Sequence, residues 1–448
     1  MPSTQNLSPL EESTLHYYWG NGFSHLADSH NRWSWENEEL EQAIFHYRMA
    51  LTFDGISAMP DLTTCQLYTN LANSLSTIGR FIEAIGYYNS ALAIDPSFVM
   101  ARGNKGLCMH SYGEIQFDGT FQQAISRSAY FEFAAATHLE SRRFDVQPQF
   151  ASYLEYIESE YGILAPHTDL ADEDRFADLP PLPRAYRRWA LENKLYINPM
   201  NDLGSYGIAA DDLFHITPKF EILDDKHTTL LEFVSQIKQE FASARYLLYS
   251  GVELGVVHHS DNETYTMEIS ESLLLDYRIE QIKASLRTSY SIFDKIGFFL
   301  NYYFGLGIDE HEVSFSGIWY ENSRNRDNLR PEFRQQQNWP LRGLFWLSKD
   351  LIYDNTMHAE TSLEPGAREL ARLRNQVEHR YVQTYSLSSE SNITDSYGDY
   401  NNELAYQIPR ERLVELSLQM LQKVRAAIIY FILGLNKKEL QREHDLLH

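Results

Sequence analysis

The stretch from Leu373 to Tyr381 carries the side chains of this sequence that are best suited to chemistry, namely Arg374, Asn375, His379 and Tyr381. A histidine can accept or donate a proton near neutral pH, and an arginine guanidinium can bind an oxyanion through two parallel hydrogen bonds. Asparagine and tyrosine add uncharged groups that can orient a substrate. This set of residue types fits acid–base catalysis on an anionic substrate.

A helix over residues 366–384 is predicted to position these side chains, with Glu364-Pro365 at its start. At 100° per residue, one face gathers three apolar side chains and is therefore expected to be buried; these are Leu370, Leu373 and Val377. Asn375 and His379, four residues apart, point away from this face. His379 is therefore not expected to be a core histidine.

The same helical geometry places Arg374 and Tyr381 on one strip at the edge of the buried face. The alternative to an active site is a solvated helix surface on which Arg374 pairs with Glu378. Arginine before glutamate is the poorer order for such a pair, which contributes only about 0.2–0.5 kcal/mol. The alternative also gives His379 no role.

The composition is that of a globular protein, with 43% hydrophobic and 22% charged residues in 448. The formal net charge is −24, which argues against a protein that coats nucleic acid through a broad basic face. It leaves room for an enzyme that contacts RNA at one small site. The chain is long enough for two or three domains.

The remaining sequence features predict a cytoplasmic protein with neither metal nor cofactor. The two cysteines, Cys65 and Cys108, give no disulfide framework, and the N-terminus lacks the features of a secretory signal. The longest apolar run, residues 426–435, is too short to span a bilayer, so no membrane association is expected. His258-His259 lacks the spacing of a zinc site.

Residues 1–140 are predicted to form a helical repeat region. Residues 39–51 and 80–92 align with each other, and both contain Ala-Ile, an aromatic residue four positions after the alanine, and then Ala-Leu. Small residues at this spacing let two helices pack closely around the aromatic ring. The pattern resembles the second helix of a tetratricopeptide repeat, although a different helical hairpin array remains open. Such arrays bind a peptide, a partner or a neighbouring domain.

The rest of the chain is predicted to be a linker or wrapping segment, residues 141–225, and a helical bundle, residues 226–448. An acidic run followed by three prolines marks the linker, and a short helix is expected at residues 184–193. Residues 228–249 have the periodicity of an amphipathic helix. Four later helical blocks indicate an antiparallel up-and-down bundle, at residues 272–304, 338–353, 366–384 and 409–445. The predicted fold class is therefore all-α.

Residues Arg374-Asn375-Gln376-Val377-Glu378-His379 match the Arg-polar-x-x-x-His motif of the HEPN superfamily (higher eukaryotes and prokaryotes nucleotide-binding), and Tyr381 matches its extended form. The resemblance covers about residues 228–445. The segments Ser289–Ile296 and Trp346–Leu351 look like those of a HEPN subfamily predicted to cleave RNA. The resemblance implies a bundle of four to five helices with the motif in the third main helix.

The resemblance also implies a metal-independent endoribonuclease that works as a homodimer, with two copies of the motif lining one cleft. Arg374, His379 and Asn375 are then the catalytic residues, and Tyr381 contacts the substrate. Arg324 and Arg326, in a loop, are weaker candidates for RNA contacts. Asp294 and Lys295, in the first bundle helix, are expected to be structural.

Three functions remain open at this point. The first is a defence or toxin-type ribonuclease that is controlled by its repeat region, which itself binds a protein or peptide. The second is a catalytically silent scaffold that binds a nucleotide or a protein. The third is a HEPN toxin regulated by modification of Tyr381, because some toxins with the extended motif are adenylylated there.

Overall fold

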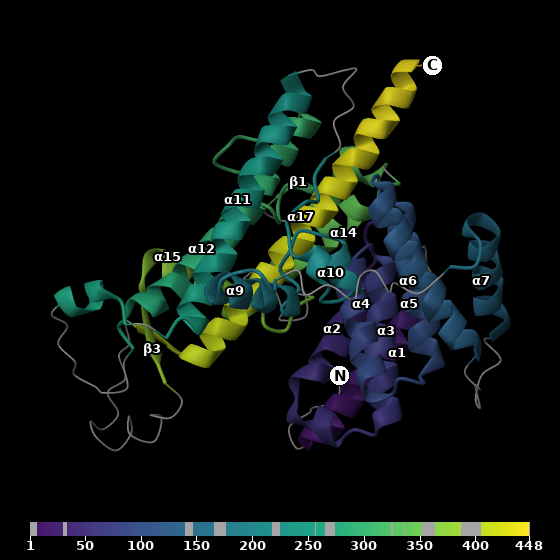
Figure 1. Ribbon diagram of the computed structural model, residues 1–448, viewed down its shortest axis with the longest axis horizontal. Helices are drawn as coiled ribbons and strands as arrows, with labels where there is room; N and C mark the ends of the chain where they lie inside the picture. Colours follow the sequence, from purple (N-terminus) through teal and green to yellow (C-terminus); the bar gives the residue numbers. More distant parts are fainter. Residues whose placement is uncertain are drawn as a thin grey trace.

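The computed structural model describes residues 7–29, 34–138, 147–164, 176–216, 225–255, 257–264, 274–323, 326–335, 337–351, 363–386 and 405–447. Helices dominate this part of the chain, and its strands are short and form two two-stranded sheets. The all-α prediction is confirmed. Figure 1 shows the N-terminal helices packed beside the C-terminal ones, with the long helix α17 crossing the molecule between them.

The N-terminal region is a series of helical hairpins. Neighbouring helices pair as α1 with α2, α3 with α4 and α5 with α6, and α7 packs on α6. The bounds are α1 Pro9–Ser29, α2 Glu38–Thr52, α3 Asp61–Thr77, α4 Phe81–Ile94, α5 Val99–Glu114, α6 Gly119–His138 and α7 Gln147–Tyr161, with a 3-10 turn η1 at Asp54–Ala58. Helix α1 was not predicted, because its sequence lacks the alanine pattern of the later helices.

The two aligned segments lie in α2 and α4 and make the same contacts. Their alanines are fully buried, and Tyr47 and Tyr88 lie between helices with 1% exposure each. The Tyr47 hydroxyl donates to Asn21 on α1 at 2.9 Å, and the Tyr88 hydroxyl donates to Asn73 on α3 at 2.6 Å. Each tyrosine thus bonds to an asparagine on the preceding helix of its own hairpin. The hairpins fit the tetratricopeptide-like pattern, which stays a prediction.

The region between the repeats and the bundle contains α9 (Pro181–Glu192), a single turn α10 (Met200–Leu203) and a 3-10 turn η2 (Gly207–Ala209). Proline is tolerated in the first turn of a helix because the N–H groups there have no intrahelical partner. Pro181 therefore starts α9 instead of breaking it. The bonds of Arg425 on α17 to the Tyr196 carbonyl, the Asn198 carbonyl and Asp202 fix this segment against the bundle.

The C-terminal region is built around α17 (Arg410–Leu447), which packs against α11 (Asp225–Glu253), α12 (Tyr277–Phe304) and α14 (Trp339–Ser348). Helices α11 and α12 form a hairpin, and α15 (Ala367–His379) lies on α12. The smaller elements are η3 (His259–Glu263), a β1–β2 hairpin (Tyr320–Asn322 and Asp327–Leu329), α13 (Pro331–Arg334) and η4 (Lys349–Leu351). Strands β3 (Tyr381–Tyr385) and β4 (Ala405–Pro409) pair in parallel.

Residues 410–440 of α17 are long and apolar enough to cross a membrane, with a mean hydropathy of 1.3 over the most apolar window. However, 78% of that window is buried inside the protein. A central core helix can have the same length and composition. Burial inside the protein therefore explains why α17 is long and apolar without a bilayer.

The two regions meet at a close backbone contact. Gly79, in the turn between α3 and α4, has a φ of +88°, and a Cβ there would lie 2.4 Å from the Trp339 carbonyl oxygen. A Cβ on Gly343 of α14 would lie 2.3 Å from the Gly79 oxygen. The Trp346 indole donates to the Trp35 carbonyl at 2.7 Å in the same interface. Only glycine permits this approach, so α14 is seated directly on the repeats.

Candidate active site

Helix α15 carries Arg374, Asn375 and His379. Ala367, Leu370 and Leu373 are buried, with exposures of 3%, 4% and 0%. Asn375 and His379 are exposed, so both point away from the face that packs on the core, as the helical geometry predicts. The prediction that His379 is not a core histidine is confirmed.

The helix ends at His379, five residues earlier than predicted, and Tyr381 lies on β3. The prediction that Tyr381 shares a helical strip with Arg374 is therefore wrong. The physical reason is strand pairing, because Tyr381-Val382-Gln383-Thr384-Tyr385 alternates in burial and bonds along β4, which lies 24 residues further on. Periodicity within the segment does not reveal a parallel partner so distant in sequence.

Arg374 is held against α12 by two side chains. Its guanidinium carbon lies 5.5 Å from the ring centre of Tyr290, and its Nη2 lies 3.7 Å from Oδ2 of Asp294. Its Nη1 also donates to Oδ1 of Asn375 at 3.2 Å. Arg374 is 39% exposed, so the charged group is fixed at the surface and still open to solvent.

The surroundings of Arg374 alter two ionisable groups. Burial raises the pKa of the Tyr290 hydroxyl, which therefore stays protonated at neutral pH. Partial burial also raises the pKa of Asp294, and the positive charge of Arg374 opposes that rise. Nε of Arg374 is buried and makes no hydrogen bond with the described residues. The Asp294 contact is long, so an incoming phosphate can compete for the guanidinium.

Tyr381 is 44% exposed, and its hydroxyl accepts a hydrogen bond of 3.0 Å from Gln383. It follows His379 by two residues, across the junction of α15 and β3. The structure therefore keeps Tyr381 next to the motif, although on a strand. Its hydroxyl has access to solvent.

The two loop arginines are placed differently. Arg324 lies outside the described residues. Arg326 lies in the turn of the β1–β2 hairpin, with a φ of +52°, and this hairpin is well separated from α15 in Figure 1. Arg326 is thus not part of the surface that carries Arg374 and His379.

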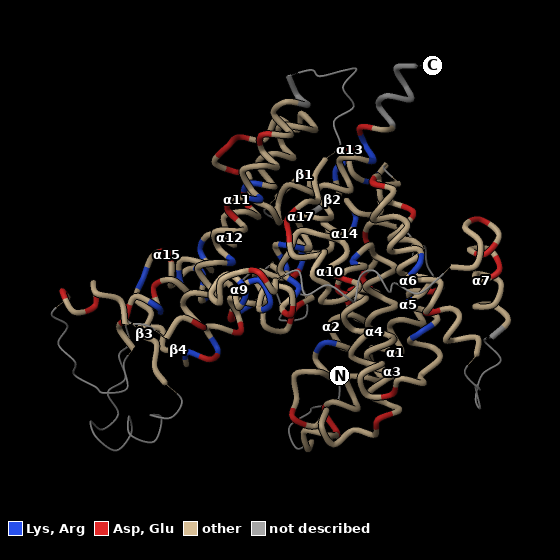
Figure 2. Tube along the Cα trace, viewed as in Figure 1, with Lys and Arg blue, Asp and Glu red and all other residues tan. Residues whose placement is uncertain are grey.

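Sequence reasoning missed several residues around the motif. Asp294 and Lys295, expected to be structural, both form ion pairs: Asp294 with Arg374, a contact that was not predicted, and Lys295 with Glu240 of α11 at 2.5 Å. Three further arginines surround the motif, all exposed: Arg368, Arg372 and Arg380. Figure 2 shows basic positions clustered at α15 in a chain that is acidic overall. A count of basic residues over a short sliding window of the sequence would have found this cluster.

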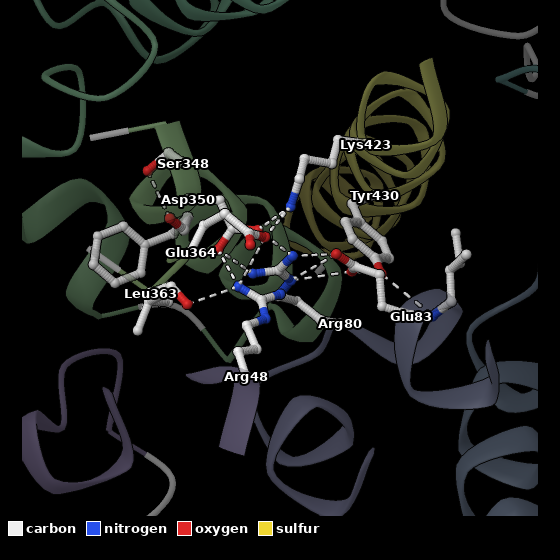
Figure 3. Close-up of polar contacts among 11 residues, drawn as sticks. Arg48, Arg80, Glu83, Ser348, Asp350, Leu363, Glu364, Lys423 and Tyr430 are labelled. Atoms are coloured by element: carbon white, nitrogen blue, oxygen red, sulfur yellow. Dashed lines mark hydrogen bonds and ion pairs between the residues drawn. The ribbon is translucent and has the colours of Figure 1, made fainter. Parts of the chain in front are cut away.

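The start of α15 is anchored by a buried charge cluster that we call the Asp350 cluster: Arg48, Arg80, Asp350, Glu364 and Lys423. Asp350 is fully buried and accepts hydrogen bonds from Arg48 at 2.8 Å, from Arg80 at 2.7 and 2.9 Å and from Lys423 at 2.6 Å (Figure 3). Lys423 also bonds to Glu364 at 3.0 Å. The carboxylate thus joins cations from both regions of the chain.

Arg48 connects this cluster to α15. It donates to the Leu363 carbonyl at 3.0 Å and lies 3.6 Å from Glu364, three residues before α15 begins. A repeat-region side chain therefore contacts the residues that lead directly into the helix carrying Arg374 and His379.

Comparison with known proteins matches residues 223–438 to the family described as LA2681-like HEPN. This range includes α11, α12, α14, α15 and most of α17, and so contains the whole candidate site. Searches of curated proteins and of solved structures found no match. The helical bundle, the position of the motif at the end of α15 and this match agree, and the C-terminal region of the chain is a LA2681-like HEPN domain.

Proposed function

We propose that this protein is a metal-independent endoribonuclease whose HEPN domain cleaves RNA through the 2′-hydroxyl. The observation that carries the proposal is the arrangement of α15, which presents Asn375 and His379 to solvent beside an arginine held by Tyr290 and Asp294. The HEPN family match supports it. The role of the protein would be that of a defence or toxin-type effector under the control of its repeat region.

In the proposed reaction, the 2′-oxygen attacks the adjacent phosphorus and the bond from phosphorus to the 5′-oxygen breaks. The products are a 2′,3′-cyclic phosphate and a 5′-hydroxyl. His379 removes the proton of the 2′-hydroxyl or supplies one to the leaving 5′-oxygen. Arg374 stabilises the extra negative charge on the phosphorane through two N–H groups.

Asn375 and Tyr381 have supporting roles in this proposal. Asn375 already accepts a hydrogen bond from Arg374, so it orients the guanidinium and can bond to the 2′-hydroxyl. The ring of Tyr381 is exposed enough to stack on a base. The exposed arginines Arg368, Arg372 and Arg380 attract the RNA backbone to an otherwise acidic protein.

The proposed site is completed by a second copy of the chain. Each chain supplies one His379, yet the reaction needs both a proton acceptor and a proton donor. The exposure of Asn375 and His379 leaves that face of α15 available to a partner. A homodimer that brings two α15 helices together would provide two histidines and two arginines around one phosphate.

The test is incubation of the purified protein with total RNA in EDTA, followed by analysis of the cleaved ends. We expect cleavage by the wild type to leave 2′,3′-cyclic phosphate ends, and His379→Ala to reduce it at least about 100-fold. His311→Ala, at another exposed histidine, is the matched control and should be unchanged. Cleavage that needs added metal, or equal cleavage by His379→Ala, would contradict the mechanism.

Two further variants separate positioning from chemistry. Arg374→Lys keeps the charge but loses the planar two-point contact, so we expect a large loss of cleavage. Asp294→Asn removes the carboxylate that holds Arg374 and should lower cleavage less, with little change in stability because Asp294 is half exposed. Activity that stays proportional to protein concentration in a strictly monomeric sample would exclude the dimeric site.

A second candidate function rests on the exposure of Tyr381. A hydroxyl on a strand edge with 44% of its residue exposed is accessible to a modifying enzyme, as regulation by adenylylation requires. Intact mass measurement of protein co-expressed with its genomic neighbours would reveal one added AMP, and Tyr381→Phe should abolish it. A catalytically silent scaffold is the outcome if neither cleavage nor modification is found.

A further inference from the structure

A cavity lined mostly by charged and polar residues lies between the repeat region and the HEPN domain, away from the motif. Its volume is about 440 Å³, and it is lined by residues of α2, α4, the turn after α9, the segment before α15 and α17. Binding sites for small molecules are typically about 300–1,000 Å³ in volume. The cavity is thus large enough to hold a ligand of roughly nucleotide size.

Most of the charged groups around the cavity already have partners. Arg48 and Lys423 share Asp350 and Glu364, and Arg425 bonds to Asp202 at 2.6 Å. The charges in these pairs neutralise one another. Such buried charges keep their positions because each is held by several hydrogen bonds.

Lys194 is the exception among the lining cations. It makes no hydrogen bond or ion pair through its side chain with any residue that the structure describes. Burial lowers the pKa of Lys194, and the nearby Asp202 opposes this fall. An anion entering the cavity would give the Lys194 ammonium the partner that it lacks.

The backbone at Lys194 also points to a function for this side chain. Lys194 is the second residue after the end of α9 and has a φ of +57°, and its N–H and that of Leu195 bond to the Leu191 and Ala190 carbonyls. Glycine or asparagine usually occupies this left-handed position because a Cβ is strained there. The chain places a lysine at the cavity in spite of that strain.

The uncharged part of a ligand also has polar groups to contact. Asn89 and Ser90 of α4 and Gln419 and Gln422 of α17 line the cavity. These side chains offer both donors and acceptors. The site therefore suits a molecule that combines a negative group with a polar body.

We propose that this cavity binds a small anionic molecule of nucleotide size or below, whose phosphate or carboxylate groups are bound by the lining cations Lys194, Lys423 and Arg48. In that position the anion competes with Glu364 for Lys423 and Arg48. Glu364 lies three residues before α15. When the anion displaces Glu364 from Arg48 and Lys423, the start of the helix that carries Arg374 and His379 becomes less firmly held. Ligand binding at the repeats is thus coupled to the motif.

Calorimetry on the full-length chain tests binding, with inorganic phosphate, AMP, ATP and citrate as anionic probes and adenosine as the uncharged one. We expect at least one anionic probe to bind and adenosine to bind more weakly. The phosphate and citrate arms distinguish a phosphorylated ligand from a carboxylated one. Absence of binding by all four anionic probes overturns the proposal.

Variants locate the site. Lys194→Gln should weaken binding at least about tenfold, because it removes a charge-assisted contact. Glu364→Gln should tighten binding, because it removes the competing carboxylate. Lys438→Gln is the matched control, because Lys438 lies on α17 about four turns beyond the lining residue Lys423. Wild-type affinity in both Lys194→Gln and Glu364→Gln would place the anion elsewhere and refute the assignment.

Hydrogen exchange measures the coupling without any assay of RNA cleavage. Saturation with the bound probe should speed exchange in residues 363–373, which lead into α15 and form its first turns, and leave α11 unchanged. Unchanged or slower exchange at α15 would overturn the coupling. Since this readout does not involve His379 chemistry, it can succeed or fail independently of the ribonuclease proposal.

Discussion

Asp350 is the position at which one substitution should most weaken the contact between the two regions. In Asp350→Asn, one fully buried carboxylate that accepts bonds from Arg48, Arg80 and Lys423 is replaced by a neutral amide. Removing one partner of a buried ion pair costs about 3–5 kcal/mol, because the remaining charge stays buried.

The partners that remain set the expected loss within this range. Arg80 keeps its bonds to Glu83, and Lys423 keeps its bond to Glu364. Arg80 and Lys423 therefore still have a carboxylate partner in the variant. We expect the free energy of unfolding to fall by about 3 kcal/mol, the lower end of the range, and not by the sum of three broken ion pairs. For a chain of this size, with an unfolding entropy of about 2.1 cal/mol/K per residue, the loss corresponds to a fall in Tm of about 3 °C.

Differential scanning calorimetry at pH 7 measures this effect. The matched control is Glu280→Gln, which breaks an exposed pair with Lys283 at 2.8 Å. Glu280 is 59% exposed, and pairs of this kind contribute about 0–1 kcal/mol. If Asp350→Asn lowers Tm no more than Glu280→Gln does, the cluster does not hold the two regions together and the reasoning is refuted.

Two other predictions concern the same interface. Gly343→Ala places a methyl group 2.3 Å from the Gly79 oxygen and should lower stability by about 1–3 kcal/mol. Gly86→Ala is the control and should be neutral or stabilising, because a Cβ there meets nothing within 4 Å. Equal thermal stability of the two variants would show that the two backbones can move apart at no cost. Burial by itself would raise the pKa of Asp350, but its three cations hold that pKa well below the usual range. The ionised carboxylate therefore makes its full contribution to the free energy of unfolding above about pH 4. That contribution is lost only as the pH falls through the lowered pKa. The Tm difference between wild type and Asp350→Asn should therefore be constant from pH 7 to about pH 4, and its disappearance at pH 5 would contradict this assignment.

The sequence predicts those features that depend on local periodicity. The buried face of α15 and the outward direction of His379 follow from a helical turn of 100° per residue, and the packed alanines of α2 and α4 follow from their spacing. The end of α15 does not follow, because it depends on β4, which lies beyond 19 intervening residues. Local patterns carry no information about such a partner.

The ion pairs between segments distant in sequence could not be predicted for the same reason. Arg48 and Asp350 are 302 residues apart in sequence, and Asp294 and Arg374 lie on different helices. A lone arginine in a repeat helix and a lone aspartate after α14 each resemble ordinary surface residues. Only the docking of the two regions makes them partners.

Helix α17 serves as a core element for both regions. The Tyr430 ring packs against Phe81 with centroids 4.9 Å apart, and its hydroxyl bonds to Glu83 at 3.0 Å. On the other side of α17, Phe431 packs against Phe299 of α12, with centroids 5.6 Å apart. The boundary of the HEPN family match is therefore not a boundary of independent folding.

This shared helix limits how such a protein can change over evolution. A HEPN domain that carried its own closed core could be moved between genes and joined to other domains. Here, exchange of the repeats would leave one side of α17 and much of α14 without the residues that cover them. Substitutions on the two sides of that interface must therefore occur together, and the N-terminal helical hairpins and the HEPN domain are inherited as one unit.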